Sequence, residues 1–264
     1  MSRGALASLG VVALLASGCG GKDATSVLSA TAANLGKIRS GTLHVELLVS
    51  PHGTKTGTPF GFELAGPFSL GGSGSLPLLD VEYTQIANGK RATVTLVSDG
   101  RHAYVETGGR RIALSPEQEQ ALRSASGPAQ TGALERQFPI GSWVEHAKVS
   151  DGGEVGGADT DKVTAELDVA RAARDLLGLA RSLGRPVPEL GADDRKRLAD
   201  SVRSSSFELY TGKKDRLLRR LRIDADFGLD VPKTLRAALG ALVGARFTFE
   251  LAVDRPNRKI ARIE

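Results

Sequence analysis

Apolar and polar residues alternate in several short segments of the first half of the chain, and short turn sequences separate these segments. The segments are residues 42–49, 60–66, 79–86, 92–97, 102–106 and 111–114. Asp99-Gly100 and Gly108-Gly109 are typical of tight turns between strands. Because successive side chains of a strand point to opposite faces, the pattern predicts an antiparallel meander with one apolar face.

Further strands and helices follow this meander. We expect strands at residues 144–149, 160–168, 206–210, 217–227 and 245–253, and helices at residues 26–38, from 115 onward, at 169–183 and at 193–202. The order predicts class α+β: a strongly curved antiparallel β-sheet, or half-barrel, with helices packed on its concave face. This arrangement leaves room for an apolar cavity between the layers. Residues 26–264 are expected to form a single domain.

The first residues read as a lipoprotein signal peptide. Arg3 supplies the positive start, residues 6–15 are apolar, and Ala16-Ser17-Gly18 are small residues before Cys19. The segment resembles a bacterial lipobox, although Ala16 stands where a leucine is usual. We therefore predict transfer of a diacylglyceryl group, with fatty acids such as palmitate, to the Cys19 thiol, cleavage after residue 18, and a polar tether over residues 19–25.

This signal predicts a cell-membrane location, lipid-anchored on the extracytoplasmic side. Ordinary secretion with an incidental cysteine is the alternative, whereas the apolar stretch falls short of the roughly 20 residues of a membrane-spanning helix. Cys19 is the only cysteine in the chain. The exported domain therefore has no internal disulfide to stabilise it.

Composition and motifs argue against several function classes. The formal net charge is +5, and the densest basic cluster, residues 213–222, reads as a solvated outer strand face rather than a nucleic-acid site. His44, His52, His102 and His146 lack metal-ligand spacing. Asp159-Thr160-Asp161 begins like a calcium loop but continues with Val163 at a ligand position. We expect no metal, no cofactor, no nucleic-acid partner and no catalytic residues.

One segment carries a family resemblance. Residues 155–169 read VGGADTDKVTAELDV and are similar to the pattern V-G-G-x-x-T-x-x-V-x-G-x-x-D, with Ala165 where glycine is common. The chain in this respect resembles the LppX/LprAFG-like lipoproteins of actinobacteria, members of a wider fold group with the carriers LolA and LolB. The resemblance implies a membrane-tethered, exported protein that binds a lipid or glycolipid in an apolar cavity and carries it.

The strand and helix positions that face inward are the candidate lipid-binding residues. They are Leu47, Phe62, Val81, Tyr83, Val94, Leu96 and Tyr104 in the strands, and Leu176, Leu179, Ala180 and Leu183 in the helix at 169–183. The inner positions are mostly aliphatic, which suits acyl chains. Periodicity alone does not distinguish a cavity wall from a solid core. Residues 124–132, rich in small and turn-forming residues, are expected to form a mobile loop.

Two other functions remain open at this point. The sheet of an envelope sensor or assembly protein binds a protein partner instead of a lipid, and an envelope hydrolase with an unrecognised site is the less favoured alternative. We expect a monomer.

Overall fold

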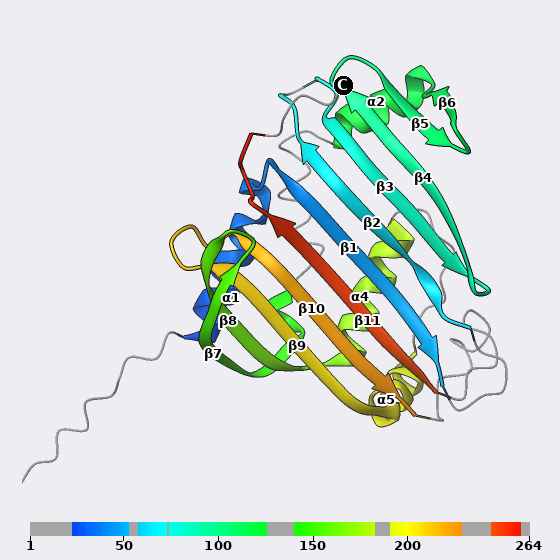
Figure 1. Cartoon of the computed structure of the whole chain (residues 1–264). Coiled ribbons are helices and arrows are strands. Elements are labelled where there is room, and N and C mark those ends of the chain that lie inside the picture. The colour runs from blue at the N-terminus through cyan, green and yellow to red at the C-terminus, as the bar shows by residue number, and fades with distance from the viewer. Residues whose placement is uncertain are drawn as a thin grey trace, which may run out of the picture.

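Among the described residues, 11 strands form a single antiparallel sheet with strand order β6-β5-β4-β3-β2-β1-β11-β10-β9-β8-β7 (Figure 1). The computed structural model describes residues 23–52, 58–72, 74–125, 140–182, 191–228 and 244–259. The strands are β1 (Ser40–Pro51), β2 (Phe60–Ser69), β3 (Leu78–Ala87), β4 (Lys90–Asp99), β5 (Ala103–Thr107), β6 (Arg110–Ala113), β7 (Val144–Val155), β8 (Ala158–Leu167), β9 (Val202–Gly212), β10 (Leu218–Phe227) and β11 (Ala245–Asp254). The helices are α1 (Ala24–Asn34), η1 (Leu35–Lys37), α2 (Pro116–Ala125), η2 (Ile140–Ser142), α4 (Val169–Ser182) and α5 (Ala192–Ser201).

The sheet consists of two meanders that meet in its middle. Strands β1–β6 form the first meander, and strands β7–β11 form the second. They are joined by the antiparallel pairing of β1 with β11, in which Leu47 lies opposite Phe249. The segment that opens the first meander is thus hydrogen-bonded to the segment that closes the second, and β6 and β7 are the two edges of the sheet.

The predicted fold class, α+β with an antiparallel sheet, is confirmed, and each expected strand has a counterpart. The largest differences in length are at β9, which is longer at both ends, and at β7, which was expected to end near residue 149 and continues to Val155. Register shifts occur between Glu145 and Lys148 and between Asp151 and Gly153, where Gly153 has φ 64°. These β-bulges absorb extra residues, so the strand continues through a sequence that reads as a turn.

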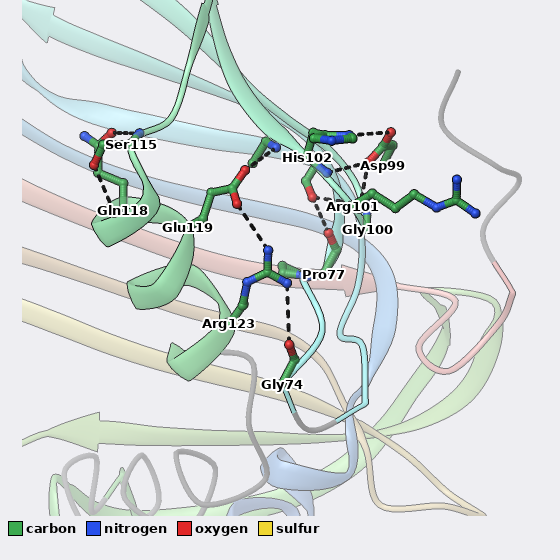
Figure 2. A network of polar contacts seen from close by, with 12 residues as sticks. Gly74, Pro77, Asp99, Gly100, Arg101, His102, Ser115, Gln118, Glu119 and Arg123 are labelled. Atoms are coloured by element: carbon green, nitrogen blue, oxygen red, sulfur yellow. Dashed lines mark hydrogen bonds and ion pairs between the residues drawn. The ribbon is translucent and has the colours of Figure 1, made fainter.

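Local capping signals set the helix starts. Asp23, assigned to the tether from the sequence, is the N-cap of α1, and its carboxylate accepts hydrogen bonds from the backbone N–H groups of Thr25 and Ser26 at 3.3 and 3.0 Å. Before α2, the Gln118 side chain accepts from the Ser115 N–H at 2.8 Å while the Ser115 hydroxyl accepts from the Gln118 N–H at 3.3 Å (Figure 2). This reciprocal capping box fixes the start of α2 directly after β6.

The glycines of the segment that carries the family resemblance form the turn between β7 and β8. Gly156 and Gly157 have φ of 58° and 75°, which suits a two-residue hairpin turn. A Cβ on Gly156 would lie only 2.8 Å from Cδ of Arg219 and 3.1 Å from the carbonyl oxygen of Val253. The Gly156 carbonyl also accepts a hydrogen bond from the Arg255 N–H at 3.1 Å. Glycine at 156 therefore lets this hairpin lie against the end of β11.

The main hydrophobic core lies on one face of the second meander, which we call the inner face. Side chains of β8, β9 and β10 pack there against α1, η2 and the first turns of α4. Fully or nearly fully buried members are Val27, Leu28, Trp143, Val163, Phe207, Leu209, Leu221 and Ile223. Across this core, the Trp143 indole N–H donates to Oδ2 of Asp175 at 3.0 Å and so ties α4 to the start of β7.

The opposite, outer face carries rows of paired charges. Arg222 and Arg246 both contact Asp224, at 2.7 and 3.0 Å, and Lys162 contacts Glu208 at 2.6 Å. The expectation that the basic cluster at 213–222 is a solvated strand face is wrong for Arg219, whose side chain is only 4% exposed and pairs with Asp215 at 2.7 Å. A register shift between Leu218 and Arg220 redirects this side chain, which is what a β-bulge does.

Candidate functional site

The inner face continues across the first meander as an apolar surface, and strand register shows which residues share it. Leu47 lies opposite Phe62, Tyr83 opposite Val94, and Val81 opposite Leu96. Leu64 of β2 lies opposite Tyr83 and links the first pair to the others. Directly opposed residues of antiparallel strands project to the same face. The structure thus brings together all but one of the strand residues chosen from the sequence.

This surface is closed at one end and open at the other. Along β3 the exposed fraction is 8% at Leu79 and 6% at Val81, and it reaches 37% at Tyr83. On β4 the inner position Ser98 is buried, whereas Ala92, near the other end of the strand, is exposed. The apolar surface therefore opens toward the β3–β4 turn, and its half-buried middle is formed by Leu47, Phe60, Phe62, Leu64, Val94 and Leu96.

Helix α2 closes the buried end through polar contacts (Figure 2). One carboxylate oxygen of Glu119 accepts from the Ala103 N–H at 3.2 Å, and the other accepts from Arg123 at 3.1 Å. The Ser98 hydroxyl donates to the Pro77 carbonyl at 2.6 Å. In the adjoining turn the Asp99 carboxylate accepts from the backbone N–H groups of His102 and Arg101, which lowers the pKa of Asp99.

Aromatic side chains are divided between the two faces. Every phenylalanine in the described residues lies on the inner face: Phe60, Phe62, Phe68, Phe207, Phe227, Phe247 and Phe249. The rings of Phe62 and Tyr83 stack with centroids 6.0 Å apart. The inner wall is thus richer in aromatic side chains than the sequence pattern indicated.

The placement of Tyr104 differs from the sequence prediction. Tyr104 lies opposite Val97 and Ala113, whereas the inner-face residue Leu96 lies opposite Val105. Tyr104 is therefore on the outer face, where the Arg111 guanidinium lies 4.7 Å from its ring centroid. Tyr104 is not part of the apolar surface.

The lipid-binding residues predicted in the helix at 169–183, the lipidation of Cys19 and the loop at 124–132 remain predictions. Leu176, Leu179 and Ala180 belong to α4, but their side chains lie outside the described part of the structure. Leu183 and Cys19 lie outside the described residues altogether, as does the predicted loop at 124–132 from residue 126 onward.

Helix α4 is held on the inner side of the sheet by its first half. Val169 and Ala173 pack with Ala225 of β10 and Phe247 of β11. Burial tends to raise the pKa of the Asp175 carboxyl, but hydrogen bonds from Arg174 and Trp143 outweigh it and leave the pKa below its usual value. In Figure 1 the helix passes behind β1, β2 and β11. The first turns of α4 thus pack on the second meander, and the helix continues behind β1 and β2 of the first meander.

Sequence reasoning missed two residues of the apolar surface, Phe60 and Leu64. Both alternate with Phe62 along β2, and Phe60 lies opposite Val49 in the register with β1. The period-two spacing of Phe60, Phe62 and Leu64 was the available signal.

A separate surface pocket of about 250 Å³ lies on the second meander, lined by Val149, Ser150, Asp151, Asp161 and Lys213. Its charges are paired: Lys213 contacts Asp151 at 3.0 Å, and Arg216 contacts the buried Asp161 at 2.5 Å. The hydrogen bond to Asp151 raises the pKa of Lys213. These carboxylates make the pocket unsuitable for acyl chains.

The described residues contain no metal-binding cluster and no membrane-spanning helix. Among them, no group of three or more His, Cys, Asp or Glu side chains is arranged to hold a metal ion. His52, His102 and His146 each contact a single carboxylate, at 3.1, 3.9 and 3.2 Å. None of the helices in the described ranges has the length and apolarity needed to cross a bilayer.

Comparison with known proteins finds similar solved structures at low sequence identity. No protein-family model and no curated protein matches the chain. Similar solved structures include LprF from Mycobacterium bovis (12% identity, TM-score 0.41, covering 91% of this chain and 96% of that one). They also include the Mycobacterium tuberculosis lipoprotein LppX (11%, 0.38, 90% and 97%) and a LolA superfamily protein from Nitrosomonas europaea (10%, 0.22, 90% and 94%). With TM-scores below 0.5, these likenesses do not indicate which ligand this chain binds.

Proposed function

We propose that the protein is an exported lipoprotein, anchored through a lipidated Cys19, that binds acyl chains of a lipid or glycolipid on the inner face of its first meander. The observation that carries the proposal is the continuous half-buried apolar surface from Leu47 to Leu96, which opens at Tyr83. Each methylene moved from water to this surface contributes roughly 0.8 kcal/mol, so an acyl chain needs few polar contacts to bind.

A charge on the inner face tests lipid binding. Phe62→Lys places an ammonium group in the middle of the surface, whereas Ala65→Lys places the same group on the outer face of the same strand, beside Glu82. The lipid-free proteins are titrated with a fluorescent fatty acid, and the purified proteins are examined for retained lipid by native mass spectrometry. We expect Phe62→Lys to weaken binding by about tenfold or more and Ala65→Lys to leave it unchanged.

Equal affinity of the two variants and the parent protein would refute binding at this surface. A stoichiometric polypeptide in place of lipid in the mass spectrum would favour the sensor or assembly function.

The anchor is tested separately. Cys19→Ala removes the thiol that accepts the lipid, so we expect the protein to leave the membrane fraction or to remain unprocessed. Ser17→Ala keeps a small residue before the cleavage site and is the matched control. Membrane association of Cys19→Ala that still requires detergent for release would contradict the anchor.

A further inference from the structure

The two edges of the sheet differ in how they are protected against pairing with another strand. An edge strand presents unpaired backbone N–H and C=O groups to solvent, and proteins commonly blunt such edges with bulges and charges. Edge strand β7 has two register shifts, and His146 within it has φ 51°. Edge strand β6 pairs with β5 without a register shift, from Thr107 opposite Arg110 to Tyr104 opposite Ala113. The β6 edge thus has regular strand geometry.

The side chains of β6 are also accessible. All four residues of the strand are exposed, and Ile112 is 53% exposed, which is large for an apolar side chain. Ile112 lies opposite Val105, which in turn lies beside Leu96 in the register, so Ile112 extends the inner apolar face to the very edge. A strand added to β6 would continue both the hydrogen-bonded ladder and this apolar face.

The charge of this edge selects the kind of partner. Arg110 and Arg111 belong to β6, and Lys90 and Arg91 lie on the part of β4 that extends beyond its pairing with β5. Glu106 pairs with Arg111 and Glu63 pairs with Arg91, while Lys90 and Arg110 have no carboxylate partner among the described residues. The edge therefore keeps a positive charge. Two copies joined through β6 would bring arginines together, which disfavours a dimer of this chain and favours an acidic partner.

We propose that β6 is an acceptor edge for an extended acidic polypeptide, which adds to the sheet as a further strand. One set of alternate side chains of the added strand would be apolar and lie on the inner face beside Ile112. The other set would be acidic and lie on the outer face beside Arg111, whose guanidinium it would share with Glu106. This binding site is distinct from the acyl-chain surface in the middle of the inner face.

A labelled peptide of alternating valine and glutamate residues tests the proposal by fluorescence anisotropy with the full protein. Arg111→Glu reverses the charge on β6, and Lys148→Glu makes the same reversal on the exposed surface of edge strand β7. We expect Arg111→Glu to weaken peptide binding by about tenfold or more and Lys148→Glu to leave it unchanged. A peptide of alternating valine and lysine should bind Arg111→Glu better than the parent protein.

Ile112→Asp provides a second variant. Because Ile112 is exposed, this variant should keep the circular dichroism spectrum of the parent protein, and it should also lose binding of the valine–glutamate peptide. Equal losses for Arg111→Glu and Lys148→Glu would indicate general charge attraction and overturn the proposal. Self-association of the parent protein that is abolished by Ile112→Asp would also overturn the proposal. Binding to anionic vesicles that depends on Arg111, in a protein that does not bind the peptide, would overturn it as well. Fatty-acid binding should be unchanged in Arg111→Glu, so failure of this proposal is distinguishable from failure of the lipid-binding proposal.

Discussion

The two meanders use the same strand pattern but bury their inner faces to different degrees. In the second meander Phe207 is 1% exposed and Leu209 is 2% exposed. In the first meander Phe62 is only half-buried, and Tyr83 is 37% exposed. Alternation of apolar residues is therefore sufficient to create an inner face, but whether that face becomes a core or an accessible surface depends on what covers it.

The cover of the second meander comes from segments distant in the chain. Val27 and Leu28 of α1 are 4% and 5% exposed in its core, and the buried hydroxyl of Thr31 contacts that of Thr211 at 3.0 Å. Trp143, after η2, adds the only tryptophan of the chain. In the first meander, by contrast, α4 passes behind β1 and β2 (Figure 1), and α2 is bound at one end of the sheet through Glu119 and Arg123.

The largest expected effect is on stability. Phe207→Ala leaves a cavity in a packed core and should lower the free energy of unfolding by about 3–5 kcal/mol. Phe62→Ala removes a half-buried ring and should cost roughly 1–1.5 kcal/mol in lipid-free protein. Urea titrations monitored through Trp143 measure both values. Similar losses at the two positions would show that the first meander is packed as tightly as the second.

Amide hydrogen exchange should be slower in the second meander than in the first. Amides in the paired centre of β10 should exchange only through global unfolding, because their strand lies in the packed core. Amides of β5 and β6 should exchange faster through local opening, since these strands are short and lie at an edge. Exchange resolved by mass spectrometry at the peptide level checks this order. Uniform protection across the sheet would mean that the two meanders open only together.

Acid should weaken the second meander through Asp224. Burial tends to raise the pKa of this carboxyl, but hydrogen bonds from Arg222, Arg246 and Thr248 lower the pKa by more than burial raises it. The folded pKa therefore lies below the unfolded value. Its stabilising contribution is present above the unfolded pKa of about 3.9 and is lost as the pH falls through the folded pKa. Asp224→Asn should therefore lower the urea midpoint at neutral pH. On acidification, the urea midpoint of this variant should fall less than that of the parent protein.

The control for the acid experiment is Glu154→Gln, an exposed residue of β7. If both variants change the acid dependence equally, the contribution does not come from the charge network of the second meander.

The smallest effect is expected on α5. Lys196 and Asp200 form an exposed pair at 2.6 Å, with side chains 75% and 61% exposed. Lys196→Ala should change stability by no more than about 0.5 kcal/mol, because solvent screens such pairs. A larger loss, measured in the same urea titration, would indicate that the surface of α5 contributes to the packing of α4.

The sequence predicted most elements but not all side-chain orientations. Tyr104 stands between Ala103 and Val105, so three consecutive residues are apolar and the local pattern does not say which parity faces inward. The pairing of Tyr104 with Val97 places it on the outer face, because a shift of one residue reverses the side of the sheet. Arg219 is a similar case, since its burial depends on a bulge that strand alternation does not reveal.

The sequence by itself determined the strands, the turns and the amphipathic character of the sheet, because alternation, glycine turns and helix caps act within a few residues. Only the tertiary structure decided that β1 pairs with β11, and that α1 and Trp143 pack on the second meander. These contacts join residues far apart in the chain, and the apolar sides of the helices can pack against the inner face of either meander. Burial at Phe207 and accessibility at Phe62 follow from which face the helices cover, and the two phenylalanines carry no local difference that predicts it.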